Sequence, residues 1–118
     1  PERTLVDGFR RLDLVGGFEE LVTSAAGFPS LDFEKLDAVL FAYGLQNLYA
    51  GVGWFLETYQ GHFFVPDDYL ERMEDRRPAA PQYLPRRGRT EGGRGRMVSR
   101  WNVILPEAVV DGTVADEP

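Results

Sequence analysis

The sequence predicts an α+β fold that is mainly helical, with about five helices and a small antiparallel sheet or hairpin near the C-terminus. Apolar residues recur every three or four positions over most of residues 1–77, which is the period of helices packed on a core. Glycine and proline divide this part of the chain into short segments. Residues 97–105 instead show the two-residue alternation of a strand.

The ends of the expected helices carry their own signals. Asp32 or Ser30 can cap the third helix by accepting a backbone N–H, and Pro66 suits the opening of the last one. Gly27 and Gly44 stand where the left-handed residue at the end of a helix is usually glycine. The expected helices span residues 1–13, 18–27, 33–43, 45–60 and 67–77.

The helix over residues 45–60 is expected to be the spine of the core, because large apolar side chains follow one another along it. Gly51 and Gly53 lie inside this helix, although each costs about 1 kcal/mol relative to alanine. Such glycines are typical of a close approach by another part of the structure. One hypothesis is that this face pairs two copies of the chain.

The expected sheet is small. Residues 97–105 form its best strand, Tyr83-Leu84 is a candidate edge strand, and residues 62–65 read as an extended or turn segment. Because a lone hairpin is marginally stable, we expect this strand to pair with further structure, part of it upstream of Pro1. Residues 1–107 are expected to be one globular domain, followed by a flexible acidic tail over residues 108–118.

The amino-acid composition indicates a globular protein without disulfides or a membrane-spanning helix. With 43% hydrophobic and 13% aromatic residues, the chain of 118 residues belongs to the globular class. It has no cysteine, which predicts a cytoplasmic protein without disulfides or thiolate metal sites. No apolar run approaches the roughly 20 residues that a membrane helix needs. We expect neither a metal nor any other cofactor.

The charge is unevenly placed. The net charge is −6, yet residues 86–100 contain six arginines against Glu91 and carry +5, which leaves −11 for the rest. Guanidinium groups bind phosphate in a bidentate manner, and Tyr83 and Trp101 flank this stretch, where they could stack on bases. A protein partner or simple solvation are the alternatives. The candidate contact residues are Arg86, Arg87, Arg89, Arg94, Arg96 and Arg100.

Three other sets of polar residues are candidates for catalysis or metal binding. Asp32, Glu34 and Lys35 have the acid–x–Lys spacing of some metal-dependent nucleases, but such sites lie on a strand and this stretch opens a helix. Asp67, Asp68 and Glu71 could be metal ligands, but the helix dipole favours acids at the start of a helix without any metal. His62 has no partner nearby in sequence that would make it a catalytic base, so a structural role is expected.

Three stretches together resemble one known family. They are "PERTLVDGFRRLDLVGGFEELV", "LDFEKLDAVLFAYGLQNLYAGVGWFLE" and "GRMVSRWNVILPE". In this order they are similar to the C-terminal domain of the AbiEi-type antitoxins, which are transcriptional regulators of abortive-infection and type IV toxin–antitoxin systems that act in phage defence. The resemblance extends over about residues 1–107, and its first stretch is the most specific.

The resemblance implies a non-enzymatic regulatory domain. In that family an N-terminal winged helix binds the operator DNA, and the C-terminal domain is implicated in neutralising a nucleotidyltransferase-like toxin and in cooperative DNA binding. The chain would then be the C-terminal part of a longer protein, with the DNA-binding half before Pro1. An oligomerisation module without antitoxin activity is the main alternative, and a nuclease the lesser one. The motif positions expected to hold the fold are Arg3, Asp7, Gly17, Glu20, Gly53 and Glu57.

Overall fold

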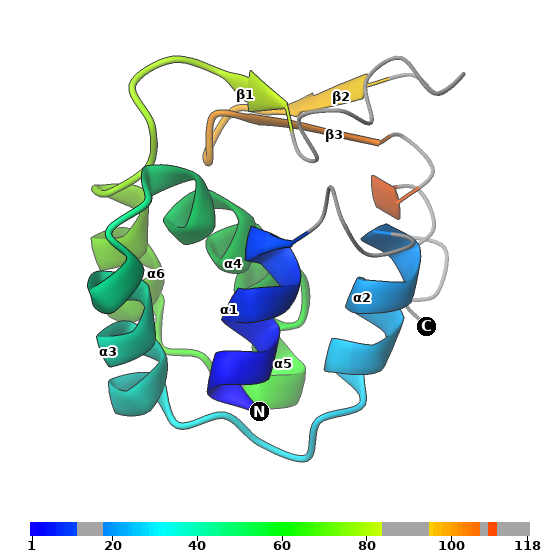
Figure 1. The fold of residues 1–118 in the computed structure, drawn as a ribbon, viewed down its shortest axis with the longest axis vertical. Helices are drawn as coiled ribbons and strands as arrows, with labels where there is room; N and C mark the ends of the chain where they lie inside the picture. The colour runs from blue at the N-terminus through cyan, green and yellow to red at the C-terminus, as the bar shows by residue number, and fades with distance from the viewer. Residues whose placement is uncertain (12–17, 84–94, 107–108, 111–118) are drawn as a thin grey trace.

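The computed structural model describes residues 1–11, 18–83, 95–106 and 109–110. For residues 18 and 19 it describes the backbone but not the side chains. These residues form helices followed by a three-stranded sheet near the C-terminus, so the predicted α+β, mainly helical class is confirmed. The elements are α1 Glu2–Arg10, α2 Phe18–Ala26, α3 Phe33–Tyr43, α4 Gln46–Thr58, α5 Gln60–Phe63, α6 Asp67–Glu74, β1 Gln82–Tyr83, β2 Gly95–Val98 and β3 Val103–Pro106 (Figure 1).

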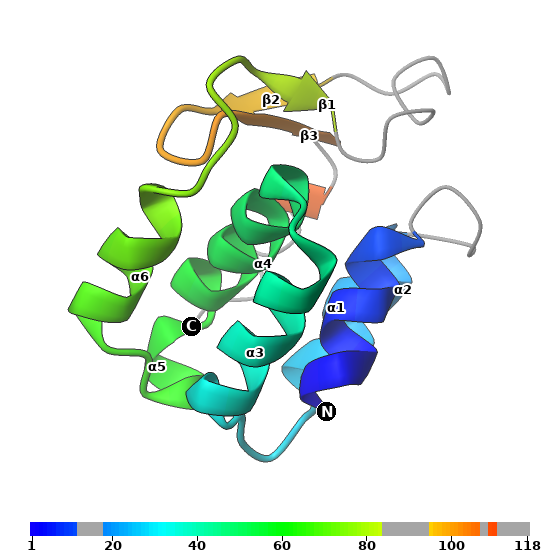
Figure 2. The ribbon, with the colours of Figure 1, turned by 60° about the vertical axis from the view of Figure 1, so that its left-hand side comes forward.

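Helix α4 is the spine of the core, as its apolar run predicts. Every residue from Leu48 to Leu56 is buried. Helices α1 and α6 pack directly on α4, which runs between them, while α2 and α3 pack on α1 (Figure 2). The ring of Phe55 lies 6.4 Å from that of Phe9 in α1 and 5.8 Å from that of Phe63 in α5, measured between centroids. Aromatic contacts of this kind stabilise the centre of the helical part.

The ends of α3 follow local sequence rules. Asp32 Oδ1 accepts the backbone N–H groups of Glu34 and Lys35 at 3.0 and 3.2 Å, which satisfies two donors that have no partner inside the helix. At the other end Gly44 has φ 64°, and its N–H donates to Leu40 O at 3.0 Å. Asp32 is therefore the cap, rather than the alternative Ser30.

The segment over residues 62–65, predicted to be extended or a turn, begins instead as a helix. The helix expected over residues 45–60 ends at Thr58, and a separate single turn, α5, follows from Gln60 to Phe63. Phe64 ends this turn in the left-handed region, with φ 55°. Pro66 then opens α6, as predicted. The Tyr59 backbone, with φ −110°, bends the chain between the two helices.

The sheet lies at one end of the helical part (Figure 1) and has the order β1-β3-β2. Strands β2 and β3 are antiparallel, whereas β1 joins β3 in parallel, so the sheet is mixed. The prediction of one strand over residues 97–105 is wrong, because this stretch turns back at residues 99–102 to make a hairpin. Tyr83 does lie in an edge strand, and Leu84 falls outside the described residues.

The turn inside that stretch has a physical cause. Asn102 adopts φ 55°, which asparagine tolerates better than most residues, and its Nδ2 donates to Pro78 O at 2.8 Å. Trp101 is completely buried against the helices instead of continuing a strand. The two-residue alternation could not reveal this, because it placed Trp101 on the same face as the buried residues of β3.

Two expectations about boundaries fall largely outside the described residues. Gly16 and Gly17, which separate the first two expected helices, and most of the tail expected over residues 108–118 are not described. Within the expected tail, Val109 is buried in the core and Val110 packs against it. Apolar contacts with the domain therefore continue past residue 107.

Candidate functional site

The arginine-rich stretch is the first candidate, and two of its arginines belong to described residues. Arg96 lies in β2 with an exposed side chain, and Arg100 follows in the hairpin turn. Of the six candidates, the remaining four lie outside the described residues: Arg86, Arg87, Arg89 and Arg94.

Arg100 joins the hairpin turn to two helices. Its Nη1 donates to Glu57 Oε2 in α4 at 2.6 Å, and its Nε donates to Glu74 Oε1 in α6 at 2.8 Å. Burial alone would lower the pKa of Arg100, but the hydrogen bonds that its guanidinium donates to both carboxylates outweigh it and raise the pKa above its ordinary value. The guanidinium thus ties three elements together, and its charge is largely engaged within the fold.

Trp101 sits beside this ion-pair cluster. Its Nε1–H donates to Glu57 Oε1 at 2.8 Å, so the same carboxylate binds both residues of the turn. The indole lies on Gly53, where a Cβ would overlap three carbons of the ring. Gly53 and Glu57 are one helical turn apart on α4, and together they form a seat for the indole.

Two sequence-based expectations are corrected by this arrangement. Trp101 cannot stack on bases, because its side chain is fully buried. The Gly53 face cannot pair two copies of the chain, because Trp101 of the same chain occupies it and Gly51 is buried as well. The close approach that interior glycines predict is real, but the approaching group is a side chain from within the chain.

The remaining motif positions lie around α1. Asp7 accepts a hydrogen bond from the Tyr43 hydroxyl of α3, while Arg3 is exposed. Neighbouring Glu2 accepts the backbone N–H of Asp32 at 2.7 Å, which lowers the pKa of Glu2 and connects α1 to the start of α3. Glu20 in α2 is exposed, and Gly17 lies outside the described residues.

The residues that are candidates for catalysis or metal binding make contacts that support the fold. Asp32 is occupied as the cap of α3, and Asp67 accepts from Gln60 Nε2 at 2.6 Å. His62 Nε2 lies 3.3 Å from Phe28 O, and its ring meets Phe63 edge-on. Among the described residues, no group of three or more histidine, aspartate or glutamate side chains is placed to hold a metal ion.

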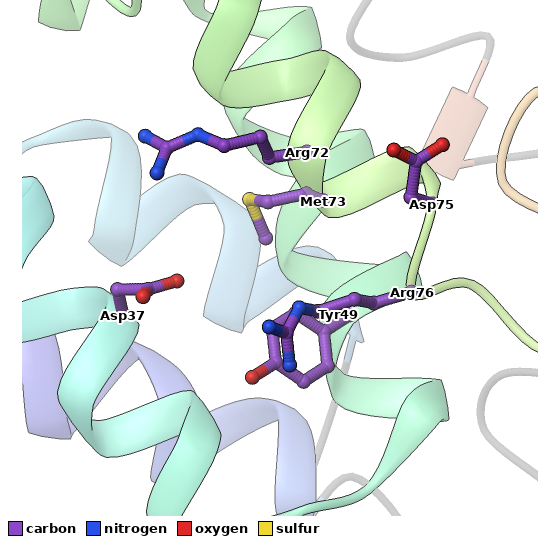
Figure 3. Close-up of a pocket in the computed structure, with 6 residues that line it drawn as sticks. All are labelled: Asp37, Tyr49, Arg72, Met73, Asp75 and Arg76. Carbon is purple, nitrogen blue, oxygen red and sulfur yellow. The ribbon is translucent and has the colours of Figure 1, made fainter.

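A pocket of about 260 Å³ between α3, α4 and α6 was not predicted. It is lined by Asp37, Tyr49, Arg72, Met73, Asp75 and Arg76 (Figure 3). The Arg76 guanidinium lies 5.4 Å from the centroid of the Tyr49 ring, and the Arg72 guanidinium lies 5.2 Å from that of Tyr69. Such stacking preorganises both cations.

The charged residues that line the pocket sum to no net charge. Two arginines accompany two aspartates, so net charge alone does not select a ligand. Burial raises the pKa of Tyr69 and of Tyr49, which keeps both phenols neutral. The buried hydroxyl of Tyr69 has no hydrogen-bond partner within the described part of the chain. The spacing of Arg72 and Arg76, four residues apart, was the one sequence signal that could have indicated this pocket.

Sequence reasoning also missed Glu74, which pairs with Arg100 across 26 positions. No local pattern links the two residues, because their contact depends on how the hairpin turns.

Comparison with protein-family models, with curated proteins and with solved structures gave no match. Within the described ranges, no helix has both the length and the apolar character to span a membrane.

Proposed function

We propose that the chain is a non-enzymatic regulatory domain of an AbiEi-like transcriptional regulator. In this proposal it neutralises a nucleotidyltransferase-like toxin and assists cooperative operator binding by a winged helix that precedes Pro1. The arginine stretch over residues 86–96 supplies the contact with phosphate or with the partner. Arg100 is left out of this contact surface, because its guanidinium is engaged by Glu57 and Glu74.

One observation supports the proposal most directly: the three stretches that carry the resemblance meet in space. The first stretch contacts the second through Asp7 and Tyr43. The second contacts the third where Gly53 and Glu57 receive Trp101. Residues far apart in the sequence therefore meet at positions of the resembling motifs, as expected if these motifs hold the fold. The antitoxin activity itself is carried by the resemblance alone.

Growth rescue tests this proposal. The proposal places a toxin gene beside the gene of this chain; the product of that neighbouring gene is expressed with and without the chain, and we expect the chain to restore growth. Replacing Arg86, Arg87, Arg89, Arg94 and Arg96 by alanine should abolish rescue. The control replaces exposed basic residues elsewhere, Arg11 and Lys35, and should retain it.

Failure of the folded wild-type chain to restore growth would refute toxin neutralisation by these residues. Full rescue by the arginine variant would refute only the role of the arginines. The same two variants are then compared in the protein that includes the upstream half, by its affinity for operator DNA at two salt concentrations. Loss of phosphate contacts would reduce both the affinity and its salt dependence.

An oligomerisation module without antitoxin activity is the second candidate. The exposed apolar side chains at the two ends of the molecule favour it, since Phe64 is 86% exposed and Met97 43% exposed. Growth rescue by the chain would refute this candidate, and the mass of the chain in solution tests its self-association.

A further inference from the structure

The pocket between α3, α4 and α6 contains charged groups that the fold does not pair. Within the described part of the chain, ion pairs between side chains are made by four residues outside the pocket: Glu57, Glu74, Arg77 and Arg100. The guanidinium groups of Arg72 and Arg76 and the carboxylate of Asp37 take no part in them. All three residues are exposed, so their charged groups are accessible to a ligand.

Aromatic rings hold both guanidinium groups in place. Arg72 lies in the last turn of α6 and stacks on Tyr69. Arg76 follows in the turn after this helix, where its N–H donates to Met73 O at 3.0 Å, and it stacks on Tyr49 of α4. A side chain that is already positioned loses less conformational entropy when it binds an anion. The pocket therefore presents two preorganised cations, each with the geometry to bind a carboxylate.

The two aspartates of the pocket are not equivalent. Figure 3 shows the carboxylate of Asp37 pointing toward the space between the guanidinium groups of Arg72 and Arg76. The carboxylate of Asp75 points away from this space (Figure 3). The groups that a ligand in the pocket would meet therefore carry two positive charges and one negative charge.

A buried hydroxyl near the pocket lacks a hydrogen-bond acceptor. Tyr69 is 3% exposed, and its hydroxyl has no partner within the described part of the chain. Burial raises the pKa of Tyr69, Asp37 raises it further and Arg72 lowers it, so the hydroxyl lies within electrostatic range of two charged residues of the pocket. Because an unpaired buried O–H is costly to a fold, an acceptor brought by a ligand would stabilise this part of the molecule.

The size and the lining of the pocket limit the ligand to a small molecule. Its volume of about 260 Å³ lies below the roughly 300–1,000 Å³ of pockets that hold drug-sized ligands. Met73 lines it with a buried apolar side chain, between the two arginines in sequence. A matching ligand has two anionic groups, one cationic group and a short apolar link between them.

We propose that this pocket binds an acidic amino acid, a small molecule with two carboxylates and one ammonium group. The carboxylates pair with Arg72 and Arg76, and the ammonium group pairs with Asp37. The methylene groups lie against Met73, and a carboxylate oxygen accepts the O–H of Tyr69. The bound ligand connects α3 to α6 and stabilises the folded chain by mass action. This inference is independent of the proposed antitoxin activity, because it concerns a different surface of the molecule.

Calorimetric titration of the purified chain at low salt tests the inference. Either L-glutamate or L-aspartate should bind with a Kd of about 0.1–1 mM, as expected for so small a ligand. The same ligand should raise the melting temperature by a few degrees at saturation. Glutarate and succinate lack the ammonium group, and 4-aminobutyrate lacks the second carboxylate. Each of these three should bind at least about tenfold more weakly.

Substitutions separate the two kinds of charge. Arg76→Gln should weaken the binding of both the amino acid and the dicarboxylate about tenfold or more. Asp37→Asn should weaken only the amino acid, down to the affinity of the dicarboxylate. Tyr69→Phe should weaken the amino acid about threefold without lowering the melting temperature of the free chain, because the hydroxyl that it removes is unpaired. Asp75→Asn is the matched control and should bind as the wild type.

Three results would each overturn the inference. They are a wild-type chain that binds neither amino acid, a dicarboxylate or inorganic phosphate that binds as tightly as the amino acid, and an Asp37→Asn chain that binds the amino acid like the wild type. Circular dichroism verifies that each variant is folded. Arg72→Gln replaces Arg76→Gln if the latter unfolds.

Discussion

The Trp101 seat on α4 and the Phe64 turn after α5 both break a rule of local structure, with opposite outcomes. Gly53 is unfavourable inside a helix, but the indole of Trp101 fills the space that its missing side chain leaves. Phe64 is unfavourable at a left-handed position, and its ring lies exposed. A local cost that is offset inside the chain is explained by the fold, whereas the cost at Phe64 is not offset by burial of its ring.

The largest expected effect is that of removing the indole. Trp101→Ala deletes a fully buried side chain and should lower the free energy of unfolding by about 3–5 kcal/mol. Urea denaturation followed by circular dichroism measures this loss. A loss below about 1 kcal/mol would show that the indole does not support the contact between hairpin and helix, and the first half of the comparison would fail.

The next effect tests the space that Gly53 provides. Gly53→Ala places a methyl group against the indole and should cost about 1–3 kcal/mol, although alanine is the better helix former. The control is Gly61→Ala in α5, where a Cβ would meet nothing within 4 Å, and this change should stabilise the fold by up to about 1 kcal/mol. In a Trp101→Ala background the cost of Gly53→Ala should disappear, since the clashing ring is gone.

The two carboxylates that receive Arg100 should differ in importance. Glu57→Ala removes the acceptor of the buried Trp101 Nε1–H as well as an ion-pair partner, so it should cost about 1–3 kcal/mol. Glu74→Ala removes the partly exposed carboxylate that pairs with Arg100 and Arg77 but leaves no buried donor without an acceptor, so it should cost about 1 kcal/mol or less, with part of that loss disappearing at high salt. Equal losses in urea denaturation would show that the indole N–H does not depend on Glu57.

Glu2 gives a pH-dependent contribution to the stability of the fold through the backbone N–H that it accepts from Asp32. The Asp32 N–H lowers the pKa of Glu2 in the folded chain, so this contribution is present above the ordinary pKa of 4.5 and is lost as the pH falls through the lowered folded value. Glu2→Gln should therefore be less stable than the wild type at neutral pH, and the gap should narrow as the pH falls below 4.5. A gap in melting temperature that is constant with pH would refute this role.

Most of the helices could be predicted from signals close to them in the sequence. Asp32, Gly44 and Pro66 act on backbone groups a few residues away, so the elements they start or end were predictable. A hairpin near the C-terminus was predicted, but the position of its turn was not, because the turn at Asn102 depends on Pro78 and on the seat for Trp101. The same limit applies to the sites. Interior glycines predicted a close approach on α4, but only the tertiary structure distinguishes a partner inside the chain from one outside.

The smallest expected effect is that of Phe64→Gly, and its sign matters more than its size. Glycine relieves a strain of about 1–2 kcal/mol at the left-handed position, and the greater freedom of the unfolded chain offsets about 0.5–1 kcal/mol of this gain. The melting temperature should stay the same or rise by a few degrees. Phe63→Ala, at the neighbouring buried position, should lower it markedly. A clear loss of stability in Phe64→Gly would mean that the ring supports its own fold, and the contrast with Trp101 would then vanish.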